Sequence, residues 1–84
     1  MNSNQRRTLG LIFASPTPAN LVWREIESLL VAVGCKLTEG SGSAVKFDFG
    51  EHTAFFHRPH PGKEALRYQV RDAKLFLEKI GISP

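Results

Sequence analysis

Three histidines fall within nine consecutive positions of this 84-residue chain, namely His52, His57 and His60. An imidazole gains and loses a proton near neutral pH, which suits it to general acid–base catalysis. RNA cleavage through the substrate's own 2′-hydroxyl needs a base, an acid and a cation that holds the phosphate. His57 and His60, with Arg58 between them, are therefore candidate catalytic residues for metal-free RNA cleavage.

The same histidines have two other interpretations. His57-x-x-His60 is also a spacing for two metal ligands, but a catalytic zinc site needs three protein ligands. The loop itself contains no Asp or Glu, and Cys35 is far away in sequence, so we expect no metal and no cofactor. Alternatively, His57 only ends a strand and His60 only orders the loop.

Basic residues gather around the histidine-rich loop. The chain has 11 Lys and Arg against 8 Asp and Glu, which gives a net charge of +3. This excess favours a polyanionic partner such as nucleic acid. The candidate phosphate ligands are Lys46, Arg58, Lys63, Arg67 and Arg71. A solvated basic helix face would have a similar composition and is the alternative.

Composition excludes several classes of protein. A single cysteine cannot form an internal disulfide, and no apolar run approaches the ~20 residues of a membrane-spanning helix. The polar N-terminus is not followed by the apolar core of a signal peptide, so we expect a cytoplasmic protein without membrane contact. The chain contains no GxGxxG, Walker or CxxC motif. Its length favours one domain.

Hydrophobic periodicity predicts six elements. A short helix spans residues 3–13, and a second helix is capped at Asn20 and ends at Gly34. The last helix carries an apolar stripe from Val70 to Ile80 and stops at Gly81. Strands are expected at residues 35–39, 43–49 and 52–57, with turns at 40–42 and 50–51 and a proline-containing loop at 58–63.

This order predicts an α+β fold, with helices packed on one face of a three-stranded antiparallel sheet. Side chains alternate along the strand 43–49, where Val45, Phe47 and Phe49 are interleaved with Ala44, Lys46 and Asp48. If the apolar set faces the helices, the other set lines an uncovered sheet face. On that face a substrate could reach the sheet.

With this loop and its flanking strands in view, the sequence resembles the HicA family of bacterial toxins. The resemblance covers about Trp23 to Ile82 and leaves residues 2–20 as an N-terminal extension similar to that of a longer subgroup. We therefore expect a single HicA-like domain over residues 1–84, with 1–20 as a helical extension and linker. The segments that carry the resemblance are 23–27, 39–43, 56–64 and 80–82.

The resemblance implies a fold like that of a double-stranded-RNA-binding domain, in the order α-α-β-β-β-α. It also implies the toxin of a type II toxin–antitoxin system, which cleaves messenger RNA (mRNA) without the ribosome and is covered by a HicB-type antitoxin. On this hypothesis His57 and His60 are catalytic. The RNA-binding residues are then Ser43, Ala44, Lys46, Arg58, Lys63 and Arg67.

One position departs from the family pattern. The common motif is Gly-Ser-His at the start of the second strand, and its histidine is taken as catalytic, whereas this chain has Gly42, Ser43 and Ala44. Alanine cannot transfer a proton. Either another residue such as His57 or His60 replaces it, or the position was mutated to silence the toxin, or the chain is a non-cleaving relative. The alternative function is therefore a catalytically silent module that binds RNA or antitoxin.

Overall fold

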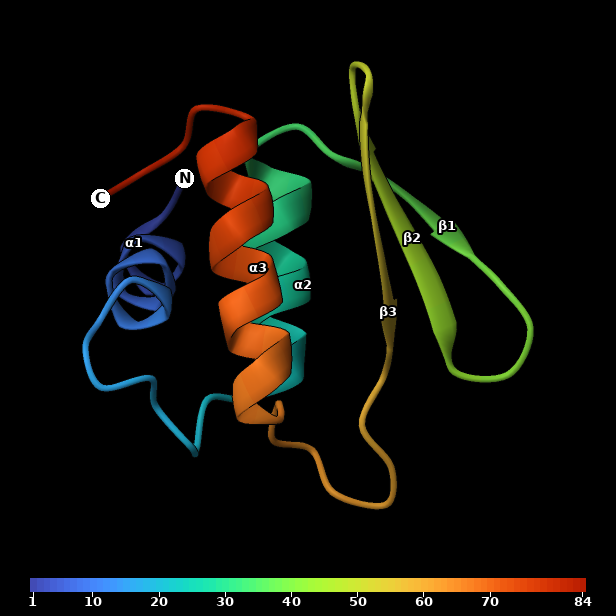
Figure 1. Cartoon of the computed structure of the whole chain (residues 1–84), viewed down its shortest axis with the longest axis horizontal. Helices are drawn as coiled ribbons and strands as arrows, with labels where there is room; N and C mark the ends of the chain where they lie inside the picture. Colours follow the sequence, from blue (N-terminus) through green and yellow to red (C-terminus); the bar gives the residue numbers. More distant parts are fainter.

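The chain forms three helices and three strands in the predicted order, an α+β fold. A computed structural model describes all residues, 1–84. The helices are α1 (Ser3–Ile12), α2 (Trp23–Ala32) and α3 (Arg67–Lys79), and the strands are β1 (Lys36–Glu39), β2 (Ala44–Phe49) and β3 (His52–His57). Figure 1 shows α2 and α3 side by side against the sheet, with α1 on their far side. The longest helix, α3, has 13 residues, and none of the three helices could span a lipid bilayer.

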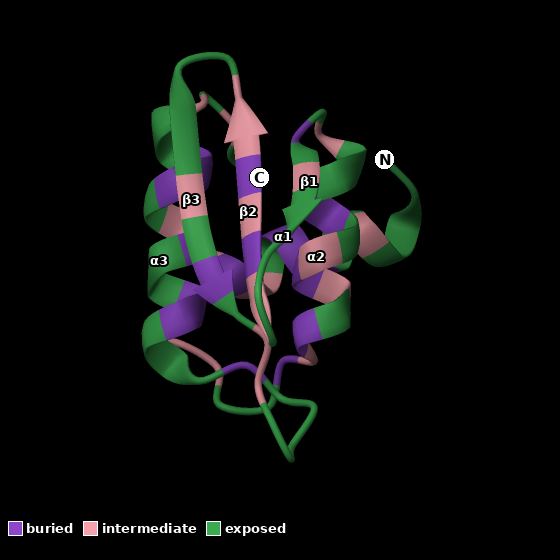
Figure 2. Ribbon diagram, turned by 90° about the vertical axis from the view of Figure 1, so that its right-hand side faces the viewer, coloured by how far each residue is buried: buried purple, intermediate pink, exposed green.

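The sheet is an antiparallel meander in the order β1-β2-β3. Val45 and Phe47 of β2 are buried beneath the helices, whereas Ala44 and Lys46 are only half-buried. The predicted alternation of β2 is thereby confirmed, because neighbouring residues of a strand project to opposite faces. Figure 2 looks onto the face that no helix covers, with α2 and α3 lying behind the strands.

An aromatic cluster joins the beginning of α2 to the sheet. The ring centroid of Trp23 lies 5.0 Å from that of Phe56 and 6.4 Å from that of Phe47. Phe47 and Phe56 are themselves 5.9 Å apart in an edge-to-face arrangement. Such pairs contribute about 0.5–1.5 kcal/mol beyond the burial of their area. The cluster fixes the end of β3, and hence His57, relative to α2.

Helix α1 packs on the outer side of α2 and α3. Leu9 and Ile12 enter the same hydrophobic core as the sheet residues, and the Gln5 amide donates a hydrogen bond of 3.1 Å to the Ser28 hydroxyl of α2. The helix is capped by Asn2, whose Oδ1 accepts from the Gln5 backbone at 2.8 Å. The cap therefore lies one residue before the predicted beginning of this helix at Ser3.

The predicted cap of α2 at Asn20 is wrong, because the helix begins at Trp23 with Val22 as its N-cap residue. The preceding segment pairs with the loop before α3, through Trp23 N–H to the Lys63 carbonyl at 2.9 Å and Ala65 N–H to the Leu21 carbonyl at 2.8 Å. These bonds hold residues 21–22 extended, so the helix cannot begin earlier. The first two strands each begin one residue later than expected, at Lys36 and Ala44.

The glycine that was expected to end α2 does so. Gly34 follows the C-cap residue Val33 and has φ +115°, a backbone conformation that side chains disfavour. Its N–H donates to the Val31 carbonyl at 3.1 Å, which satisfies one of the free carbonyls of the last turn. The chain turns there toward β1.

We predict that Ile12→Ala lowers the free energy of unfolding by about 2–5 kcal/mol, because it removes a fully buried side chain. Urea denaturation followed by the fluorescence of Trp23, the only tryptophan, measures this change. The control is Arg6→Ala at an exposed position of α1, with an expected change within about 0.5 kcal/mol. Equal unfolding of Ile12→Ala and the parent would show that α1 does not support the core.

Candidate functional site

His57 stands at the end of the uncovered sheet face. It is the last residue of β3, and its partner across the ladder is Ala44, the first residue of β2. Both side chains border a hollow of about 220 Å³, together with Lys46 and the ring of Phe55, which is 75% exposed. The Ser43 hydroxyl oxygen lies 3.4 Å from Nδ1 of His57. The imidazole is accessible there, and the small side chain of Ala44 leaves room beside it.

The backbone around His57 is held from two sides. The buried amide of Gln69 in α3 donates to the His57 carbonyl at 2.7 Å, and Gln69 also accepts from the Leu66 N–H at 3.0 Å. The Arg58 N–H donates to the Ser43 carbonyl at 2.9 Å. Sequence reasoning missed Gln69. The only indication of Gln69 in the sequence was its position next to Val70, on the apolar stripe of the last helix.

Arg58 is bound by two carboxylates. Its Nε and Nη2 donate to the two oxygens of Glu27 at 2.9 and 3.1 Å, and its Nη1 and Nη2 donate to those of Glu39 at 2.7 and 3.0 Å. Hydrogen bonds to Glu39 and to Glu27 raise the pKa of Arg58, and the bond to Arg58 lowers the pKa of Glu39. Trp23 Nε1 also donates to Glu27, at 2.9 Å. Arg58 is therefore engaged within the fold and is not a free cation for phosphate.

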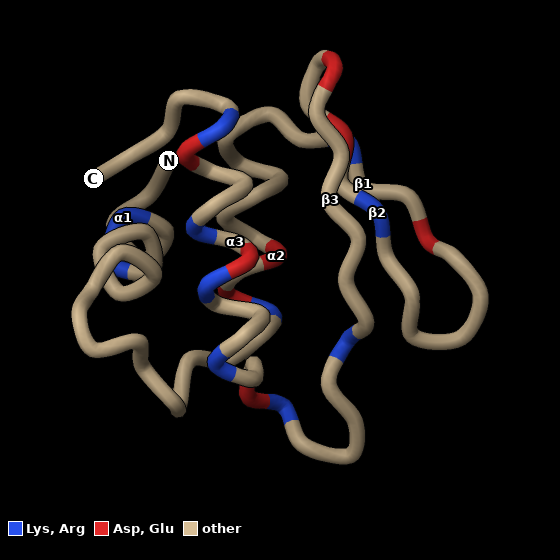
Figure 3. Tube along the Cα trace, in the orientation of Figure 1, with Lys and Arg blue, Asp and Glu red and all other residues tan.

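The other predicted RNA-binding cations differ in their surroundings. The Lys46 ammonium lies 3.7 Å from a carboxylate oxygen of Asp48, in an exposed pair that contributes little to stability. Lys63 and Arg67 are exposed and take part in no ion pair within 4.0 Å. Figure 3 shows basic residues on the sheet, in the loop after β3 and along α3, interspersed with acidic ones.

The structure does not bring the three histidines together. His60 is exposed in the loop after β3 and borders neither the hollow nor the pocket described below. His52 begins β3, so it lies about 17 Å from His57 at the usual rise of 3.3–3.4 Å per residue. Cys35 is buried, and burial followed by the charge of Asp48 raises the pKa of its thiol, which disfavours the nucleophilic thiolate.

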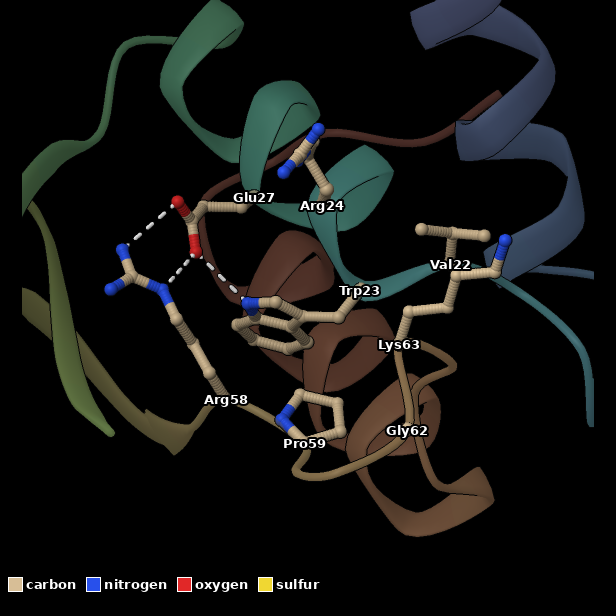
Figure 4. A pocket seen from close by; sticks show the side chains of 8 residues that line it. All are labelled: Val22, Trp23, Arg24, Glu27, Arg58, Pro59, Gly62 and Lys63. Carbon is tan, nitrogen blue, oxygen red and sulfur yellow. Dashed lines mark hydrogen bonds and ion pairs between the residues drawn. The ribbon is translucent and has the colours of Figure 1, made fainter. Parts of the chain in front are cut away.

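A second, larger depression lies at the beginning of α2, with a volume of about 580 Å³. Figure 4 shows the Trp23 indole in the middle of this pocket, with Pro59 below it in the view and Arg58 to one side. Sequence reasoning did not identify it, because its walls come from two segments far apart in the chain. The lining residues are Val22, Trp23, Arg24, Glu27, Arg58, Pro59, Gly62 and Lys63.

The fold and these residues can be compared with known proteins. A family model described as "HicA toxin of bacterial toxin-antitoxin" matches residues 23–82. The chain belongs to the HicA toxin family. A toxin of this kind works with an antitoxin partner. The match begins with the first residue of α2 and ends just beyond α3, so α1 lies outside it. Searches of curated proteins and of solved structures found no match.

In this HicA toxin Ala44 lies directly opposite His57 on the neighbouring strand. Directly opposed residues on antiparallel strands have Cβ atoms about 4.5–5.5 Å apart. A histidine at position 44 and the histidine at position 57 would therefore serve the same hollow. Gly40 makes space for residue 44, because a Cβ built on this glycine would lie only 3.1 Å from the Cβ of Ala44.

Because Glu39 binds Arg58, we expect part of the protein's stability against unfolding to be lost at acidic pH. Because the folded-state pKa of Glu39 lies below its ordinary value of 4.5, its contribution to stability is complete above pH 4.5 and is lost as the pH falls through the folded value. Glu39→Gln should therefore be less stable than the parent near neutral pH, and the difference should shrink on acidification.

Urea denaturation at a series of pH values measures this difference. Glu51→Gln is the matched control, because Glu51 is exposed in the β2–β3 turn and forms no ion pair. Its difference from the parent should not change with pH in this way. A pH-independent difference for Glu39→Gln would contradict the proposed contribution of the ionised carboxylate.

Proposed function

We propose that this HicA toxin is a cytoplasmic ribonuclease that cleaves mRNA without a metal ion, at the hollow around His57. The observation that supports this function is the combination of an accessible imidazole, Lys46 and a largely exposed Phe55 on a sheet face that no helix covers. A base of single-stranded RNA can stack on Phe55, since base–aromatic stacking does not depend on sequence. Lys46 then offers a cation to the adjacent phosphate.

The reaction needs two proton transfers. A base removes the proton of a ribose 2′-hydroxyl, and the 2′-oxygen attacks the neighbouring phosphorus while the bond to the 5′-oxygen breaks. An acid gives a proton to that departing oxygen, which leaves a cyclic phosphate on one product. We propose His57, at the hollow, for one transfer, and His60, which would reach the same phosphate from the loop rather than from the hollow, for the other. His60 is the nearest other imidazole along the chain and is exposed in the loop that follows His57.

The remaining RNA contacts belong to the same end of the molecule. Ser43 lies beside His57 and can orient its ring through the 3.4 Å contact with Nδ1. Lys63 and Arg67 supply exposed charge in and after the loop. Arg58 does not contact phosphate directly, because its guanidinium already binds Glu27 and Glu39. It instead helps to position the neighbouring His57.

We predict that His57→Ala lowers RNA cleavage by about 10²- to 10⁴-fold, the usual contribution of one general acid or base. Cleavage of a labelled single-stranded RNA in the presence of EDTA measures the rate and its independence of metal. His60→Ala should also slow cleavage, and His52→Ala at the far end of β3 is the control that should not. Cleavage by His57→Ala at the parent's rate would place the active site elsewhere.

A second function is supported by a different observation. The hollow contains one imidazole, that of His57, and Ala44 lies across from it. By the resemblance to HicA toxins described above, position 44 is where a catalytic histidine is expected. A module with this surface would bind RNA or an antitoxin without cleaving. In either case we propose that a HicB-type antitoxin covers the uncovered sheet face, where it would bury Phe55 and occlude His57.

The Ala44→His variant distinguishes the two functions. It places a second imidazole across from His57, so it should cleave RNA at least as fast as the parent if the parent is a ribonuclease. Inducible expression of both forms in a bacterial host, with and without the candidate antitoxin, provides the growth readout. Growth arrest by Ala44→His alone would show that the parent is the silent module. Arrest by both forms would support catalysis by the parent's own residues.

A further inference from the structure

The pocket at the beginning of α2 has a composition that suits part of an RNA strand. Its floor is Trp23, which is 4% exposed, and the ring of Pro59 lies next to the indole in Figure 4. At about 580 Å³ it falls within the 300–1,000 Å³ range of small-ligand sites. It therefore combines a small apolar surface, chiefly the half-buried ring of Pro59, with a volume that suits one small ligand such as a nucleotide.

Two of the cations that line this pocket are free. Arg24 of α2 and Lys63 of the loop are exposed and form no ion pair within 4.0 Å. The one carboxylate in the lining, that of Glu27, accepts hydrogen bonds from Arg58 and Trp23. Arg58 pairs with Glu27 and with Glu39, so these three groups together carry one negative charge. Arg24 and Lys63 add two positive charges, which leaves an excess of one positive charge around the pocket. Figure 4 shows Arg24 above the indole and Lys63 beside Val22, on different segments of the chain, with the Lys63 side chain extending past Val22.

The pocket is adjacent to the hollow that contains His57. Glu39 borders the hollow, Arg58 borders the pocket, and the two side chains are joined by a hydrogen bond of 2.7 Å. The Arg58–Glu39 pair is therefore a shared wall between the two depressions. A strand that crosses this wall leaves the sheet face at His57 and reaches the pocket at Pro59, two residues further along the chain.

We propose that the pocket binds a nucleotide that neighbours the cleaved bond of the RNA. Arg24 and Lys63 contact its phosphates, and Pro59 with the edge of Trp23 packs against its base or sugar. This inference rests on the proposed ribonuclease function, because it takes RNA as the ligand. On this inference Arg24 and Lys63, which lie outside the sheet face, position the RNA so that the cleaved bond lies at His57.

The test uses the full chain and a short single-stranded RNA whose 2′-hydroxyls are methylated, so that it cannot be cleaved through the 2′-oxygen. Two signals are followed over a series of salt concentrations: anisotropy of the labelled RNA and fluorescence of Trp23, the single tryptophan. We expect RNA to change the Trp23 fluorescence. In the Arg24→Ala/Lys63→Ala variant the slope of log K against log salt should become shallower by about 1.4, since each phosphate contact to a single strand contributes about 0.7.

The matched control is Arg6→Ala/Lys79→Ala, which removes the same charge from exposed positions in α1 and at the end of α3. It should keep the parent's slope and fluorescence change. An Arg24→Ala/Lys63→Ala slope equal to that of the parent would overturn the inference and leave RNA binding at the sheet face intact. Adenosine monophosphate that competes as strongly as RNA would also overturn it, by showing a site for free nucleotides.

Failure of the proposed function gives a different result. If neither the parent nor the control binds the RNA at any salt concentration, the ribonuclease proposal and this inference both fail. If a Lys46→Ala/Phe55→Ala variant loses most of the affinity while Arg24→Ala/Lys63→Ala loses none, only the sheet face binds RNA and the pocket assignment is wrong. Reduced salt dependence in both variants supports a strand that spans the two depressions.

Discussion

The hollow around His57 and the pocket at the beginning of α2 both depend on one interaction, the binding of the Arg58 guanidinium by the carboxylates of Glu27 and Glu39. Arg58 follows β3, Glu27 lies on α2 and Glu39 ends β1, so the four hydrogen bonds join three elements at one end of the molecule. The side chains of Arg58 and Glu27 are 33% and 20% exposed, and that of Glu39 is 64% exposed. Ion pairs this accessible contribute modestly to stability. Their importance is geometric, because the planar guanidinium fixes how the three elements meet.

Beneath the ion pairs, Trp23 connects the polar surface to the core. Its ring packs against Phe47 and Phe56, while its N–H donates to the same Glu27 oxygen that Arg58 binds. One residue thus couples the packing of α2 on the sheet to the orientation of the carboxylate above it. From the other side, Gln69 of α3 holds the carbonyl of His57. Both helices consequently determine where the imidazole stands.

The location of both depressions follows from the thinness of the molecule. The sheet is covered by helices on one face only, and the core lies between these two layers (Figures 1 and 2). A chain of this size has little volume for a deep internal cavity. Recognition is therefore left to the surface, where a long polymer can contact the sheet face and the beginning of α2 at once. Arg58 and Glu39 form the ridge between these two areas.

The order of the elements, the buried side of β2 and the glycine that ends α2 could all be predicted from the sequence. These features follow from local physics, because side-chain alternation and backbone sterics act over a few residues. Two features of the site depend on contacts between distant residues. His57 lies opposite Ala44 at the hollow, which His60 does not border, and Arg58 binds Glu27 and Glu39, which are 31 and 19 residues away. A charged residue looks the same in sequence whether it is solvated, paired or free to bind phosphate. Its role depends on which distant side chains folding brings within hydrogen-bonding distance.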